Sequence, residues 1–124
     1  MEITLKRIYE EAFPEDGYRV LVDRLWPRGI SKEKAHFDEW NKELAPSTEL
    51  RKWFHANPSH WDEFSVKYKK ELKKENPGPE FIERLKKQNK ITLLFASKDE
   101  KHAHPLVLRE YLEQVIQQMK SDTK

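Results

Sequence analysis

Residues 16–29 read DGYRVLVDRLWPRG, a largely apolar run that ends abruptly in charged residues. The run over residues 18–22 is nearly continuous and rich in Val and Leu, which is typical of a strand buried on both faces of a parallel sheet. In open sheets of this kind, ligands bind outside the carboxyl ends of the strands. The sequence therefore predicts a ligand site directly after this strand, around Asp23, Arg24 and Arg28.

A second buried strand is predicted over residues 91–96, and it too ends in charge, at Lys98 and Asp99. Pro105 then suits the first turn of a last helix. If the two strands are parallel neighbours, their carboxyl ends share one edge of the sheet, and so do the charged side chains that follow them.

The pairing of these two strands can be predicted residue by residue. We expect Val20 and Val22 to lie beside Leu93 and Phe95 in a parallel pair that is buried on both faces. An antiparallel pair, or strands on separate sheets, would separate the two charged turns.

The remaining pattern indicates a short first strand, three helices between the two buried strands, and a final helix. These are expected over residues 3–9 for the strand and 48–56, 59–75, 79–85 and 105–120 for the helices. In the second helix Trp61, Phe64, Tyr68 and Leu72 recur at helical spacing, which predicts that they face the core. Residues 25–46 have no clear period, but Phe37 and Trp40 are expected to anchor this segment onto the domain.

Length and composition predict one α/β domain over residues 1–120, a small and mainly parallel sheet surrounded by helices, with residues 121–124 as a frayed tail. Charged residues make up 37% of the chain and the mean hydropathy is −0.99, which would fit disorder. Four Trp, four Tyr and six Phe argue against it, because disordered chains are poor in aromatic residues.

Charge and cysteine content limit the classes of ligand and the cellular compartment that can be expected. The net charge of +2 comes from 24 basic and 22 acidic residues, so nucleic acid is not indicated as a general partner and any anion site must be local. Cysteine is absent, which excludes disulfides and thiolate metal sites. The N-terminus lacks the apolar region of a signal peptide, and no apolar run is long enough for a membrane span. We therefore expect a cytoplasmic protein without a membrane partner, and we leave its oligomeric state open.

Three cations and a histidine form the predicted site. Arg24, Arg28 and Lys98 would bind an anion, because guanidinium groups hold phosphate through two parallel hydrogen bonds. Equally, the arginines could pair with nearby carboxylates and only hold the long loop. Asp23 and His104 are the predicted proton-moving residues, since an imidazole titrates near neutrality.

Metal binding and aromatic stacking are weaker alternatives. Asp99, His102 and His104 have a spacing that could ligate zinc or manganese. The favoured interpretation is that Asp99 or His104 caps the last helix and His102 is solvated, so no metal ligand is predicted. Trp26 stands between two arginines and could stack on a ligand. The sequence has no glycine-rich phosphate loop, and no cofactor is predicted.

Several motifs of the chain occur together in one protein family. They are residues 16–29, LAPS at 44–47, LRKWFH at 50–55 and LLFA at 93–96, with Lys98 and His104. On these residues the chain resembles the YeaO-like family of small bacterial proteins. The resemblance implies a compact α/β bacterial protein, but it supplies no reaction and no catalytic residues. Family members tend to have Asn at the position of Ala103, and His102 is not typical of them, which weakens any role for His102 and His104 as a pair.

Together these features favour a protein that binds a phosphate-bearing small molecule or nucleotide at the carboxyl ends of the two buried strands. Asp23, Arg24, Arg28, Lys98 and Asp99 would line the site with His104. A hydrolase or transferase is one form of this hypothesis, with His104 or Asp23 moving a proton. The alternative is a non-enzymatic module that binds nucleic acid or a protein, with Trp26 stacking on a base.

Overall fold

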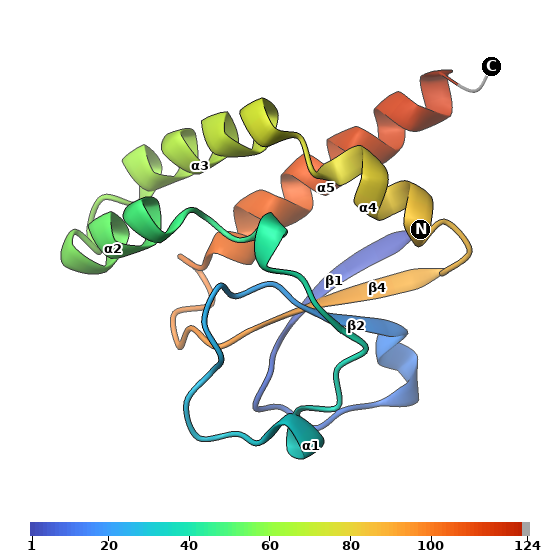
Figure 1. Cartoon of the computed structure of the whole chain (residues 1–124), viewed down its shortest axis with the longest axis horizontal. Helices are drawn as coiled ribbons and strands as arrows, with labels where there is room; N and C mark the ends of the chain where they lie inside the picture. The colour runs from blue at the N-terminus through green and yellow to red at the C-terminus, as the bar shows by residue number, and fades with distance from the viewer. Residues whose placement is uncertain (123–124) are drawn as a thin grey trace.

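A four-stranded sheet forms the centre of the computed structural model, and every pair of neighbouring strands in it is parallel (Figure 1). The strands are β1 (Glu2–Arg7), β2 (Tyr18–Leu21), β3 (Glu39–Trp40) and β4 (Lys90–Phe95), in the order β1-β4-β2-β3. The structure describes residues 1–122. The predicted fold class, a single α/β domain with a small parallel sheet, is confirmed.

Strands β2 and β4 lie side by side in the predicted register. Val20 pairs with Leu93 and Leu21 with Leu94, and the N–H of Val22 donates to the carbonyl oxygen of Leu94 (3.1 Å), which continues the same parallel pairing past the end of β2. All of these side chains are buried. The charged turns after the two strands therefore start at the same edge of the sheet.

Most of the helices follow the predicted pattern. They are α1 (Lys32–Ala35), α2 (Thr48–Ala56), α3 (Trp61–Glu75), α4 (Gly78–Arg84) and α5 (His104–Asp122). The side chain of Ser47 caps α2 by accepting a hydrogen bond from the N–H of Leu50. Helix α3 starts two residues later than expected and α4 and α5 one residue earlier. Residues 121–122 continue α5, and the last part of the expected frayed tail, residues 123–124, lies outside the described residues.

The two faces of the sheet are covered differently. Helices α2 to α5 lie on one face (Figure 1) and pack there against side chains such as Val20 and Leu93. Phe64, Tyr68 and Leu72 of α3 belong to this core, as the helical spacing predicts, and Trp61 is partly buried against it. None of the helices within residues 1–122 combines the length and the apolar character that a membrane span requires.

Residues 25–46, which show no clear period in the sequence, cover the opposite face of the sheet. There Leu21 and Leu94 pack with Trp26, Phe37 and Trp40 in a second cluster. The Trp26 ring lies 5.5 Å from that of Phe37 and 5.4 Å from that of Trp40, so the two predicted anchors are confirmed. Helix α1 and strand β3 lie in this segment and are too short to show a period in the sequence.

The turn into β2 depends on a glycine. Gly17 has φ +68°, and a Cβ atom there would overlap the carbonyl oxygen of Lys90. Next to it, the carboxylate of Asp16 binds Lys6 (3.0 Å) and Arg19 (2.5 Å). These two ion pairs tie the turn that precedes β2 to β1 and to β2 itself.

Candidate functional site

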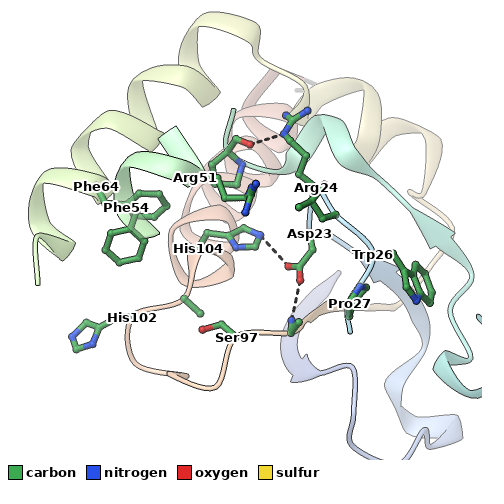
Figure 2. Close-up of a pocket in the computed structure, with 14 residues that line it drawn as sticks. Asp23, Arg24, Trp26, Pro27, Arg51, Phe54, Phe64, Ser97, His102 and His104 are labelled. Atoms are coloured by element: carbon green, nitrogen blue, oxygen red, sulfur yellow. Dashed lines mark hydrogen bonds and ion pairs between the residues drawn. The ribbon is translucent and has the colours of Figure 1, made fainter. Parts of the chain in front are cut away.

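A pocket of about 280 Å³ opens at the carboxyl edge of the sheet, where β2 and β4 end (Figure 2). Residues 23–27 after β2 and residues 96–97 after β4 form one side. The other side comes from Pro46, Arg51 and Phe54, from Phe64 of α3, and from residues 102–104 at the start of α5. Segments far apart in the sequence therefore meet at this point.

Asp23 follows Val22, the residue that continues the pairing beyond β2, and its carboxyl group is largely buried. Oδ2 accepts a hydrogen bond from the N–H of Ala96 (3.0 Å), which joins the ends of the two strands. Oδ1 is buried and has no hydrogen-bond partner among residues 1–122. Burial outweighs the hydrogen bond from Ala96 and raises the pKa of Asp23 to about 6. This carboxyl group can thus change its charge near neutral pH.

His104 begins α5 and lies beside Asp23. Its Nε2 is 2.8 Å from the carbonyl oxygen of Val22, to which an N–H at this position donates, and 3.7 Å from Oδ1 of Asp23. Burial lowers the pKa of His104 to about 4, against the weaker opposing effect of the hydrogen bond to Val22. The imidazole is therefore neutral at physiological pH, with its Nε2 proton held by the backbone. The structure thus brings the two predicted proton-moving residues, Asp23 and His104, side by side.

Arg24 ties the long loop to the end of β2. Its Nε donates to the carbonyl oxygen of Pro46 (2.8 Å) and one of its terminal nitrogens to that of Lys42 (3.4 Å). These contacts do not neutralise its charge, because backbone carbonyls carry none. Arg24 therefore holds the long loop, which was the alternative to anion binding, but it does so through backbone carbonyls and not through carboxylates. Its side chain also lines the pocket.

Arg51 is the pocket residue that the sequence reasoning missed. It projects from α2, and its Nε is buried without a hydrogen-bond partner in the described chain. Figure 2 shows its guanidinium group close to His104, between Phe54 and Arg24. The only signal in the sequence was its place directly after Leu50, inside the segment LRKWFH that carries the family resemblance.

Of the other predicted ligand-binding residues, Trp26 lines the pocket, whereas Arg28, Lys98 and Asp99 do not. Trp26 reaches its edge, but its ring belongs to the second cluster and its Nε1 donates to the carbonyl oxygen of Ile30 (2.8 Å). Arg28 is exposed in the following turn, and neither it nor Lys98 lines the pocket. Asp99 is also exposed and lies 2.8 Å from Nδ1 of His102. The structure does not bring Arg28 or Lys98 to the side of Arg24.

The three residues with metal-ligand spacing do not converge. His102 faces Asp99, whereas His104 faces Val22 and Asp23. Among residues 1–122, no three His, Asp or Glu side chains are placed to hold a metal ion.

The pocket carries a net positive charge. Arg24 and Arg51 each contribute one positive charge, His104 is neutral at pH 7, and the Asp23 carboxylate contributes one negative charge above its pKa of about 6. The sum is about one positive charge, which increases when Asp23 is protonated. An anion is the complementary ligand for such a site.

Comparison with known proteins places the chain in a family. Residues 2–124 match the family described as the inactive DUF488-N3 subclade. The chain is 44% identical over 112 residues to the uncharacterized protein YeaO of Escherichia coli (strain K12), covering 90% of this chain and 97% of that protein. It is 38% identical over 110 residues to the uncharacterized protein Rv3073c of Mycobacterium tuberculosis (strain H37Rv), covering 89% and 92%. No solved structure matches it. The chain therefore belongs to the YeaO-like family, within the inactive DUF488-N3 subclade, as the sequence resemblance indicated.

Proposed function

We propose that this protein binds a small phosphate-bearing molecule in the pocket at the carboxyl ends of β2 and β4, without turning it over. The observation that carries the proposal is the unpaired guanidinium group of Arg51. A buried donor without a partner costs about 1–3 kcal/mol, and more when it is charged. A bound phosphate would satisfy that donor and neutralise the charge, and guanidinium groups suit phosphate geometry.

Two further features support an anionic ligand. Arg24 brings a second guanidinium group whose charge no carboxylate neutralises in the described chain. Helix α5, with 19 residues, begins at His104 beside the pocket. The amino end of a helix carries a partial positive charge, so it adds to the attraction for an anion.

Binding without turnover fits both the family and the site. The matched family is described as inactive. His104 is a poor proton carrier here, because its buried imidazole has a pKa of about 4 and its Nε2 is engaged by the Val22 carbonyl.

A hydrolase or transferase remains the second candidate on one observation. Asp23 has a pKa of about 6 and an oxygen without a partner in residues 1–122, which are the properties of a general acid or base. Release of inorganic phosphate from a bound ester would favour this candidate over simple binding.

The test is calorimetric titration with inorganic phosphate, pyrophosphate and ribose 5-phosphate, repeated on Arg51→Gln. We expect wild type to bind at least one of these anions and Arg51→Gln to lose the binding. Arg28→Gln is the matched control, since it removes one exposed arginine outside the pocket and should bind as wild type does. Binding by Arg51→Gln equal to that of wild type would contradict the proposal.

A thermal melt checks the same variant for folding. Because the Arg51 side chain makes no hydrogen bond or ion pair with the described residues, its replacement should leave the melting temperature unchanged or raise it. A ligand at about 100 times its dissociation constant should stabilise wild type by about 2.7 kcal/mol and leave Arg51→Gln unaffected. Oligonucleotide binding that weakens steeply with salt would instead favour a nucleic-acid-binding module.

A further inference from the structure

The pocket has an apolar wall beside its charged end, and this wall narrows the class of ligand. Phe54 and Phe64 stack with ring centroids 4.3 Å apart and planes 19° apart. Both rings line the pocket, and Figure 2 shows them on the opposite side of Arg51 from Asp23 and Arg24. The stack holds Phe54 in place, so the pocket presents a fixed aromatic surface next to the guanidinium group.

A further apolar side chain of the pocket, that of Leu25, is exposed to solvent. Leu25 is 58% exposed, the highest fraction among the large exposed hydrophobic side chains of the described chain, and it also lines the pocket. Phosphate alone, or a sugar phosphate, would leave Leu25 and Phe54 in contact with water. A ligand with a flat apolar group would cover them.

The size of the pocket limits how large that ligand is. Small-molecule sites commonly enclose about 300–1,000 Å³, and this pocket encloses about 280 Å³. One base, one sugar and one phosphate suit the lower end of that range. A dinucleotide or a longer strand would extend well beyond the residues that line it.

From this juxtaposition of charge and aromatic surface we infer that the ligand is a nucleoside monophosphate, with its phosphate at Arg51 and its base against Phe54 and Leu25. The inference rests on the proposed function, because it requires an anion at Arg51. Stacking on an aromatic ring then supplies the added affinity, and it tolerates different bases because each has a flat face.

The experiment compares AMP, GMP, CMP and UMP with ribose 5-phosphate by calorimetric titration of the full chain. The sugar phosphate keeps the anion and the ribose and lacks only the base. At least one nucleotide should bind about tenfold or more tightly than ribose 5-phosphate, as one stacked base predicts. Equal affinities would overturn the inference and leave the proposed function standing, whereas no binding by any of these anions would refute the proposed function itself.

Two variants locate the base. Phe54→Ala should reduce nucleotide affinity to that of ribose 5-phosphate while leaving ribose 5-phosphate binding unchanged. Because Phe54 also packs in the core, Leu25→Ser at an exposed position provides a second variant that should weaken nucleotide binding severalfold. Val66→Ser is its matched control, since Val66 is 53% exposed and lies outside the pocket. Nucleotide affinity that is equal in Leu25→Ser, Phe54→Ala and wild type would overturn the placement of the base.

Discussion

Replacement of Asp23 by Asn should change how stability depends on pH. Burial raises the pKa of Asp23 and lowers that of His104, so acidification stabilises the fold through Asp23 and destabilises it through His104. The folded-state pKa of Asp23 is about 6, above its ordinary value of 3.8, so its ionised form costs stability above pH 6 and the cost disappears as the pH falls below 3.8. The folded-state pKa of His104 is about 4, below its ordinary 6.5, so stability is lost as the pH falls from 6.5 through 4.

The two contributions are similar in size and nearly cancel in the wild type. At 1.36 kcal/mol for each pKa unit, acidification gains about 3 kcal/mol from Asp23 and loses about 3 kcal/mol from His104. Asp23→Asn removes the gain and leaves the loss. The free energy of unfolding of the variant, relative to wild type, should therefore fall by about 2–3 kcal/mol between about pH 7.5 and about pH 4.

Urea unfolding followed by tryptophan fluorescence at several pH values measures this difference. Subtraction of the wild-type curve removes the contributions of all other titrating groups, because both proteins share them. Glu113→Gln, at an exposed position of α5, is the control, and its difference from wild type should stay within about 0.5 kcal/mol. If the free energy of unfolding of Asp23→Asn relative to wild type changes as little with pH as that of the control, Asp23 has the same pKa in the folded and unfolded chain. Burial would then not raise its pKa.

Two further predictions concern the elements that hold the site in place. Gly17→Ala should destabilise the protein by about 2–4 kcal/mol, because a side chain at φ +68° is strained and would overlap the Lys90 carbonyl; a loss below about 1 kcal/mol, measured by urea unfolding, would contradict this. Phe64→Ala should cost about 3–5 kcal/mol, since its 2% exposed ring fills the core beneath the pocket. An unchanged urea midpoint for Phe64→Ala would show that the face of α3 that carries Phe64 does not pack in the core.

The buried strands were predictable because each has a continuous apolar run of the right length. Val20 and Leu93 therefore pair as expected, and the turns after them meet at the pocket. Strand β3 was not predictable, because Glu39 and Trp40 are too short a segment to show a period. It forms because the loop packs its aromatic rings onto the far face of the sheet.

The residues of the site were only partly predictable, because only some of them are positioned by the buried strands themselves. Asp23 follows the strand directly, so its position depends on the strand alone. The place of Arg28 depends on how the turn leaves the sheet, which an apolar run alone does not reveal. Trp26 and Pro27 of that turn line the pocket, whereas Arg28 is exposed outside it. Arg51 lies on a helix, where a charged residue usually faces solvent. Only the docking of α2 beside the strand ends brings it to the pocket.

The most direct test of the central claim is the arginine Nε–H signal of Arg51 in a two-dimensional ¹H–¹⁵N NMR spectrum. Its assignment follows from its disappearance in Arg51→Gln. Because this N–H is buried without a partner among residues 1–122, a bound phosphate should shift it. Titration with AMP or phosphate should move the Arg51 signal to saturation and leave that of exposed Arg28 in place. A stationary Arg51 signal at saturating ligand, or equal movement of both signals, would contradict the assignment of this pocket as an anion-binding site.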